Sequence, residues 1–138
     1  MVIGESARVR RGDTWSDYLR EWSVETGSEI AAVLARRHDR CVNEFWLFHT
    51  GKEFPRMAIN VAGDLAFVHY FPYDGHPGWR LLGQVAGLDP KGETEFQICG
   101  EYDTTPNAFV VPCRVALEAA IAFSNDRRMP EVGEWYEL

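Results

Sequence analysis

The chain has 138 residues, of which 46% are hydrophobic and 25% are charged, a balance typical of one globular domain with a sizeable core. Its 21 Asp and Glu residues outnumber its 14 Lys and Arg residues, which gives a net charge of −7. This composition argues against disorder, and the acidic surface disfavours direct nucleic-acid binding because it repels phosphate backbones. It is compatible with a basic partner or with a surface that is simply well solvated.

The three cysteines, Cys41, Cys99 and Cys113, are far apart and form no C-x-x-C motif. Their number and spacing argue against a disulfide framework and against a structural zinc site. The N-terminus lacks the order of charged, apolar and cleavage regions that a signal peptide needs, and no apolar run reaches transmembrane length. We therefore expect a soluble, cytoplasmic protein with no metal, no cofactor and no membrane contact.

The first part of the chain is the hardest to assign. Residues 1–138 are predicted to form a single domain in which residues 1–16 are a possible N-terminal extension. Residues 13–25 are ambiguous, because their aromatic side chains fit both helical spacing and the alternation of a strand. We favour a strand from about Tyr18 to Glu25, since Thr26-Gly27 then forms a turn.

The first helix is predicted to run from Glu29 to about Arg37. Ser28 precedes it as the N-cap, because its hydroxyl can accept a backbone N–H of the first turn. Basic residues at the other end suit the negative end of the helix dipole. Three apolar residues at helical spacing form the buried stripe: Ile30, Val33 and Leu34.

The middle of the chain predicts an antiparallel meander. Residues 44–50, 56–62 and 65–71 alternate or are apolar on both faces, and Gly63-Asp64 supplies a tight turn between the last two. Short connections between successive strands mean antiparallel pairing. Further strands are predicted at 79–85, 93–99 and 108–111, a second helix at 114–125, and a docked tail that ends in aromatic residues. The predicted fold class is α+β, a mostly antiparallel sheet packed with two main helices.

The sequence contains no nucleophile elbow, P-loop, dinucleotide-binding glycine motif or H-E-x-x-H motif. The best metal-ligand candidates are His69, Asp74 and His76. A lone histidine on an apolar strand face, such as His69, is more often a hydrogen-bonded core residue than a ligand. A Cys–His nucleophilic pair could be assembled from Cys41 or Cys99 with His49 or His69, but nothing in the spacing selects a pair, and a free cysteine usually behaves as a small buried hydrophobic residue.

Acidic residues crowd the segment 89–103. They are Asp89, Glu93, Glu95, Glu101 and Asp103. Paired carboxylates can act as general acid and base, but no partner base is evident. The other interpretations are a solvated strand face and an acidic patch that meets a basic protein.

The loop before residue 79 combines aromatic rings with turn residues, a composition frequent in interface hot spots and also in ordinary loops. Its candidate partner-binding residues are Tyr73, Asp74 and Trp79. Together with the five acids they form the predicted partner-binding set.

Several short motifs occur in a characteristic order: GDLAFVHY at 63–70, GWR at 78–80, VVP at 110–112 and RMPEVGEW at 128–135. This order resembles immunity protein family one of bacterial polymorphic toxin systems. The most specific motif is the last, in which Trp135 follows Pro130 by five residues, and the family has an α+β fold with a characteristic tryptophan that Trp135 would match. The resemblance covers residues 18–138, whereas the segment 8–17 has no counterpart and the turn before Pro130 lacks the usual glycine or threonine.

The resemblance implies a function. Such proteins are encoded beside a toxin and bind its toxic domain in the cytoplasm of the producing cell, and the toxin is often a nucleic-acid cytosine deaminase. An enzyme that admits nucleic acid is expected to have a basic mouth, which an acidic protein can cover without chemistry of its own. The resemblance implies structural roles for Trp135 and Pro130. The rival hypotheses are a small enzyme that uses His69, Asp74 and His76 or the 89–103 carboxylates, and a structural subunit of a larger complex.

Overall fold

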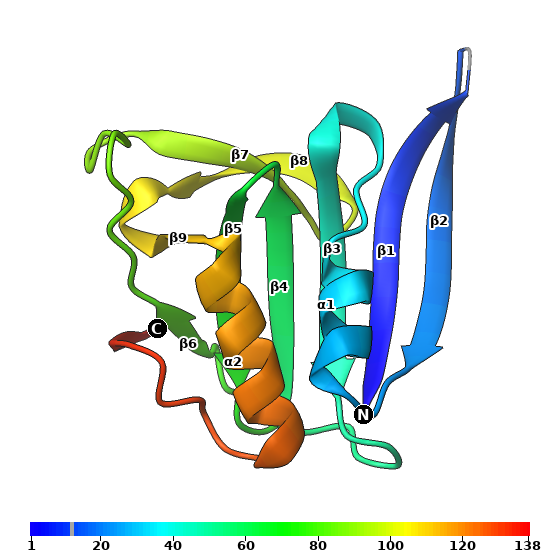
Figure 1. The fold of residues 1–138 in the computed structure, drawn as a ribbon. Coiled ribbons are helices and arrows are strands. Elements are labelled where there is room, and N and C mark those ends of the chain that lie inside the picture. Colours follow the sequence, from blue (N-terminus) through cyan, green and yellow to red (C-terminus); the bar gives the residue numbers. More distant parts are fainter. Residues whose placement is uncertain (12) are drawn as a thin grey trace.

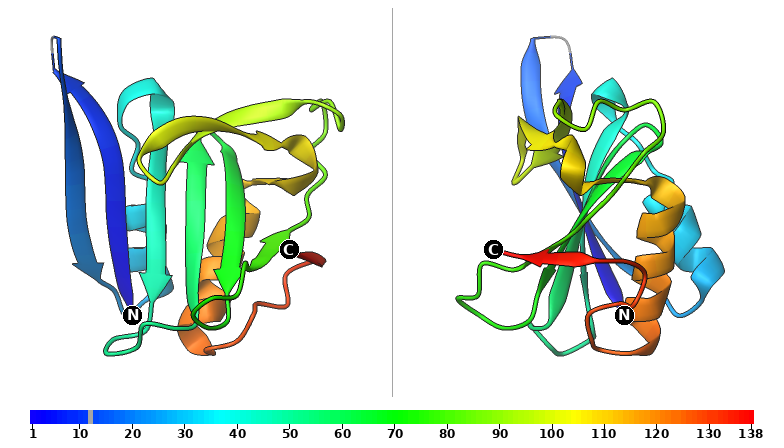
Figure 2. Two further views of the ribbon diagram at one scale, coloured as in Figure 1. Left: turned by 180° about the vertical axis from the view of Figure 1, so that it is seen from behind. Right: turned by 90° about the vertical axis from the view of Figure 1, so that its left-hand side faces the viewer.

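The structure is a computed structural model that describes residues 1–11 and 13–138, with the side chains of residues 8–11 and 15–18 outside the description. A large antiparallel sheet has two helices on one face and a two-stranded ribbon across the other (Figures 1 and 2). The predicted α+β class, with a mostly antiparallel meander and two main helices, is therefore confirmed.

The helices and strands follow one another without long gaps. The helices are α1 (Gly27–Leu34) and α2 (Cys113–Asn125), and short 3-10 turns lie at Asp39–Cys41 and Asn107–Phe109. The strands are β1 (Val2–Arg11), β2 (Thr14–Ser23), β3 (Val42–Phe48), β4 (Arg56–Ala62), β5 (Leu65–Phe71), β6 (Trp79–Leu81), β7 (Glu93–Ile98), β8 (Glu101–Pro106), β9 (Val110–Pro112) and β10 (Trp135–Glu137). The main sheet has the order β10-β6-β5-β4-β3-β1-β2, with β9 paired to β5, and β7 pairs with β8 in a separate ribbon.

The centre of the sheet is the predicted meander of β3, β4 and β5. Strands β4 and β5 have the predicted bounds, and Gly63 takes the left-handed conformation (φ 57°) that the turn between them requires. Alternate residues of β4 face the helices, as expected from their apolar side chains: Met57, Ile59 and Val61.

The N-terminal segment is part of the sheet. Strand β1 lies between β3 and β2, so most of the stretch 1–16 is an interior strand of the sheet. The ambiguous segment 13–25 forms strand β2, which pairs with β1 from Thr14 to Ser23. The favoured strand is thus confirmed, but it runs from Thr14 to Ser23 instead of from Tyr18 to Glu25. The side chains of Trp15 and Tyr18, on which the helical alternative depended, lie outside the described residues.

Helix α1 differs from its prediction at both ends. The predicted N-cap, Ser28, is wrong: Thr26 caps the helix, its Oγ1 accepting from the Glu29 backbone N–H (3.1 Å) while the Glu29 carboxylate accepts from the Thr26 N–H (3.1 Å). The helix ends at Leu34 instead of Arg37. The reason is that the Arg37 guanidinium folds back and donates to the Leu34 carbonyl oxygen (2.6 Å), which satisfies the open end of the helix.

The main core lies between the sheet and the two helices. Its fully buried side chains come from β1, β3, β4, β5 and β6 and from both helices. The largest of them are Phe45, Phe123, Ile3, Ile30, Leu47, Met57, Ile59 and Leu81. The right-hand view of Figure 2 shows both helices on one side of the sheet and the β7–β8 ribbon on the other.

Strand β3 begins and ends two residues earlier than the predicted 44–50, and the second half of the chain holds further corrections. Strand β6 ends at Leu81, short of the predicted residue 85, because the N–H groups of the next two residues bond elsewhere: Leu82 to the Glu134 carbonyl and Gly83 to the Ala108 carbonyl. Strand β8 has no counterpart among the predicted strands, because residues 101–103 stand out in the sequence only as part of the acidic segment 89–103. Strand β9 covers 110–112 instead of 108–111, and α2 begins one residue earlier than predicted.

Candidate protein-binding surface

The β7–β8 ribbon is fixed to the helix-free face by a buried carboxylate. The ribbon's two-residue turn, Cys99-Gly100, has positive φ at both residues, which the twist of a tight hairpin favours. Glu44 on β3 is 2% exposed and accepts hydrogen bonds from the backbone N–H groups of Cys99 (2.6 Å) and Gly100 (3.3 Å). Asn60 donates to the same carboxylate (3.1 Å) and to the Gln97 carbonyl (2.6 Å). Burial raises the pKa of Glu44 although these hydrogen bonds oppose the change.

Substitution Glu44→Ala is expected to loosen the ribbon selectively. The change leaves the Cys99 and Gly100 N–H groups without their acceptor, and losing a hydrogen bond to a charged group costs about 2 kcal/mol. Hydrogen exchange should therefore show faster exchange across residues 93–106, with the centre of the sheet unchanged. Glu101→Ala, an exposed position of the same ribbon, is the control. Equal protection of the ribbon in both variants would show that Glu44 does not anchor it.

The five predicted acids are all exposed, but they do not share one face. The β7–β8 register places Glu95 opposite Thr104, whereas Glu101 and Asp103 lie opposite Ile98 and Phe96. Since alternate residues of a strand point to opposite sides, Glu95 points away from Glu101 and Asp103. The acids therefore border the ribbon on both sides, with Glu93 and Glu95 on one side and Glu101 and Asp103 on the other.

Most of these carboxylates lack a cationic partner. Within the described part of the chain, Glu95 is the one member of the set in an ion pair, with Arg40 at 2.6 Å. Asp89 accepts from the backbone N–H of Lys91 (3.0 Å) and Asp103 from that of Thr104 (2.8 Å). The ribbon thus carries uncompensated negative charge on its exposed surface.

The loop at residues 72–78 follows the far end of β5, away from the ribbon, so the two halves of the predicted partner-binding set lie at opposite ends of the sheet (Figure 1). Tyr73 is 61% exposed and Asp74 is exposed. Trp79 is half-buried, packs against the main core and stacks on His76 with ring centroids 6.5 Å apart. Tyr73 and Asp74 are therefore accessible to a partner, whereas most of Trp79 serves the core.

The three candidate metal ligands make separate contacts. His69 Nε2 lies 2.9 Å from the Pro77 carbonyl oxygen, and burial together with the charge of Arg80 lowers the pKa of His69 to about 4. His76 Nδ1 accepts from the Gly78 backbone N–H (2.8 Å), and Asp74 is exposed nearby in sequence. The residues that the structure describes contain no group of three or more His, Cys, Asp or Glu side chains able to hold a metal ion.

Between the ribbon and the 72–78 loop, a line of aromatic side chains crosses the helix-free face. We call it the aromatic row: Trp46, Phe71, His69 and Phe67. Successive ring centroids are 5.8, 4.1 and 5.9 Å apart, and Phe67 also contacts Phe96 of the ribbon (6.3 Å). A cleft of about 270 Å³ opens beside the row, between the sheet and β8. Sequence reasoning missed this surface, although β3 and β5 carry apolar residues on both faces.

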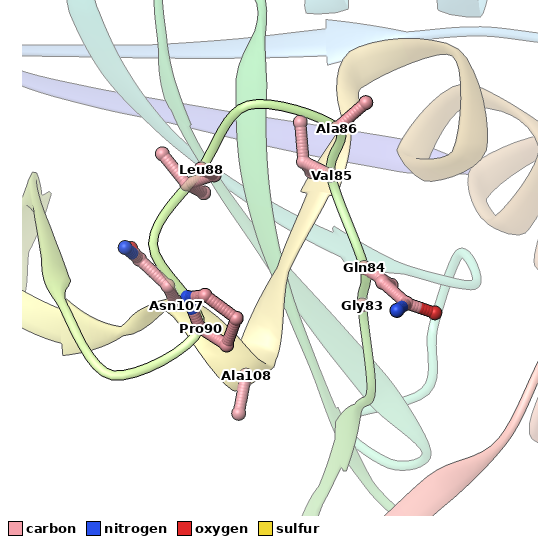
Figure 3. A pocket seen from close by; sticks show the side chains of 8 residues that line it. All are labelled: Gly83, Gln84, Val85, Ala86, Leu88, Pro90, Asn107 and Ala108. Atoms are coloured by element: carbon pink, nitrogen blue, oxygen red, sulfur yellow. The ribbon is translucent and has the colours of Figure 1, made fainter.

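A larger hollow of about 600 Å³ lies under the 83–90 loop, away from the aromatic row. Figure 3 shows it bordered by the loop on one side and by Asn107 and Ala108 on the other. Its buried polar side chain, Asn107, is already engaged: it donates to the Asp89 carbonyl (2.7 Å) and accepts from the Thr94 hydroxyl (2.6 Å). Val85 and Leu88 pack against the small core of the ribbon, and these contacts hold the loop in place. The Asn107 side chain therefore presents no free polar group to the hollow.

The C-terminal tail docks on the main core. Trp135 is half-buried, lies edge-on to Tyr70 with centroids 6.3 Å apart, and donates its indole N–H to the carbonyl oxygen of buried Pro130 (2.9 Å). Strand β10 pairs with β6 at the edge of the sheet. Trp135 and Pro130, for which the resemblance implies structural roles, are thus joined by one hydrogen bond within the docked tail.

Comparisons with known proteins add no family to these observations. No model of a known protein family matches the chain, and no match is found among curated proteins. In the described part of the chain, no helix is long and apolar enough to cross a lipid bilayer.

Proposed function

We propose that this protein is an immunity protein that binds and neutralises a cognate toxin domain in the cytoplasm of the producing cell. The observation that carries the proposal is the exposed, largely unpaired set of carboxylates on the ribbon, in a chain of net charge −7. The toxin domain is a nucleic-acid deaminase, and the protein acts by covering its active site.

Electrostatics supports this mode of action. An enzyme that admits nucleic acid needs a positive field at its entrance, and the ribbon presents the opposite field on a rigid support. Exposed charges at the rim of an interface mainly accelerate encounter, and aromatic contacts at its centre slow release. The ribbon acids and the 72–78 loop flank the aromatic row, so a partner that touches both also covers the row between them.

The proposal predicts a salt-dependent loss of association rate when the ribbon acids are neutralised. The test variant changes the ribbon acids Glu93, Glu101 and Asp103, together with Asp89 in the preceding loop, to their amides. We expect its on-rate for the deaminase domain of the adjacent toxin gene to fall about tenfold at low salt and to approach that of the unmodified protein at high salt. Stopped-flow kinetics over a range of ionic strength measures both effects.

The matched control removes the same number of charges at exposed positions outside the ribbon: Glu25, Glu53, Glu118 and Glu131. Equal on-rates in the two variants at every ionic strength would remove the ribbon from the interface. Absence of any complex with the toxin domain would contradict the proposed function itself.

A further inference from the structure

The aromatic row has an arginine at each end, and each arginine lies among rings. The Arg56 guanidinium is 5.0 Å from the Trp46 ring centroid and 4.7 Å from that of Phe54. The Arg80 guanidinium is 5.2 Å from the ring centroids of both Phe67 and Phe109. These are cation–π distances, so the rings hold both charges in place on the helix-free face.

Neither arginine is paired with an acid. Among the described residues, no carboxylate lies within 4.0 Å of either guanidinium, neither side chain donates a hydrogen bond, and the Nε atoms of both Arg56 and Arg80 are buried without a partner. Burial also lowers the pKa of Arg80. In a chain with seven more acidic than basic residues, two half-buried arginines without an acid leave a positive site whose hydrogen-bond donors are unused.

The carboxylates that line the hollows beside the two arginines do not pair with them. Glu44 and Asp103 line the cleft beside Arg80, and the exposed Glu53 lines the hollow beside Arg56. Glu44 accepts from the turn of the ribbon and Asp103 from the backbone N–H of Thr104. Since no described carboxylate lies within 4.0 Å of either guanidinium, both are open to the acidic groups of a partner.

The spacing of the two arginines favours an extended polypeptide. Arg56 on β4 pairs with Phe71, and Arg80 on β6 pairs with His69, so the arginines flank β5 two residues out of step. Strand spacing and rise then place their Cα atoms roughly 12 Å apart, and the side chains lean toward different rings. Because the two guanidinium groups lie over rings at opposite ends of the row, a separate carboxylate is needed for each. Residues four apart in an extended chain are roughly 13 Å apart and point to the same side, so they can supply both.

We propose that the aromatic row is a docking surface for an extended segment of a partner protein, which presents one carboxylate to Arg56 and another to Arg80. The inference rests on the proposed function only in that the partner is a polypeptide. The segment lies along the row, and its two acids form bidentate pairs with the arginines. Basic residues around this segment meet the exposed acids of the ribbon, so the two kinds of contact fix its orientation.

Nuclear magnetic resonance of the arginine Nε–H groups tests the proposal on the unmodified protein. The probe is a capped heptapeptide of Ala, Ser and Gly with Glu at the second and sixth positions. We expect the Nε–H signals of both Arg56 and Arg80 to shift with this peptide and to stay in place with its Gln counterpart. A peptide with two adjacent Glu residues should bind about tenfold more weakly, because it reaches only one arginine.

Three results would overturn the proposal: no shift with any peptide, equal shifts with the Gln peptide, or equal shifts with acetate at the same carboxylate concentration. The last would mean that the arginines bind small anions and recognise no polypeptide. Arg80→Met and Arg56→Met, which keep the apolar contact with the rings, should each weaken peptide binding about tenfold. Arg114→Met on the exposed surface of α2 is the control. The toxin-binding kinetics above are independent of these results.

Discussion

Replacing Glu5 is expected to cause the largest loss of stability of any single charge removal in the protein. Its side chain is fully buried on the helix face of β1 and accepts from Asn43 Nδ2 (2.6 Å), Arg36 Nε (2.9 Å) and Trp22 Nε1 (3.1 Å). His38 Nε2 lies 3.0 Å from the same carboxylate. Glu5→Ala removes the buried acceptor that these four groups share, and the unfolding free energy should fall by about 3–5 kcal/mol at pH 7. Urea denaturation measures the change.

The pH dependence of stability tests whether the charge of Glu5 causes this loss. Burial by itself raises the pKa of Glu5, but the hydrogen bonds from Asn43, Trp22, His38 and Arg36 outweigh it and lower the pKa overall. A lowered pKa in the folded state stabilises the fold above the pKa of the unfolded chain, about 4.3, and this stabilisation is lost as the pH falls through the folded value. The difference between the unmodified protein and Glu5→Gln should therefore be largest at pH 7 and shrink toward pH 3.

Glu21→Gln supplies the matched control for Glu5, since Glu21 is exposed on the neighbouring strand β2 and should change stability by less than about 0.5 kcal/mol. A Glu5→Gln difference that stays constant between pH 7 and pH 3 would contradict the charge-based explanation. Glu44 provides a contrast: its pKa is raised, so its ionisation opposes folding as the pH rises through its folded value. As the pH rises, ionisation of Glu5 therefore increases stability and ionisation of Glu44 decreases it.

Substitution Trp135→Ala is expected to lower the unfolding free energy by about 3 kcal/mol, the lower end for a large aromatic residue because Trp135 is only half-buried. The change removes the contact with Tyr70 and the hydrogen bond to the Pro130 carbonyl. Trp135→Phe keeps a ring and loses the N–H donor, so it should lower the unfolding free energy by only about 1 kcal/mol. Urea denaturation of the three proteins gives the series.

Tyr136→Ala is the comparison for Trp135, because Tyr136 is the next residue of β10 and 52% exposed. Its loss should cost less than about 1 kcal/mol. Equal destabilisation by the two alanine variants would show that the tail is held by backbone pairing with β6, and that Trp135 contributes no more than its exposed neighbour.

Sequence reasoning succeeded where a local pattern has one structural outcome. The alternation in residues 56–62 and the Gly63-Asp64 turn fixed the bounds of β4 and β5, because burial of one face requires a period of two. It failed where two local solutions compete. At the start of α1, both Thr26 and Ser28 can cap a helix, and the Glu29 carboxylate decides between them by closing a capping box with Thr26.

The missed strand β8 had a local signal. Cys99-Gly100 between two runs of strand-forming residues is the pattern of a two-residue hairpin, since the glycine accepts the positive φ that such a turn needs. Reading residues 101–103 only as acids hid this pattern. The consequence concerned function as well, because the hairpin register puts Glu95 on one side of the ribbon and Asp103 on the other.

By itself, the sequence determined the acidic charge, the α+β class, the central meander and the second helix, since composition and periodicity depend only on neighbouring residues. Tertiary structure alone decided that Glu5 and Glu44 are buried, because a glutamate on a strand is exposed or hidden according to which element covers it. It also decided that Trp46, His69 and Phe71 of the aromatic row stay half-buried at the surface between two arginines, while Phe67 is buried under the ribbon. Two helices cover only one face of the sheet, and the ribbon crosses only one end of the other, so apolar residues of β3 and β5 remain at the surface.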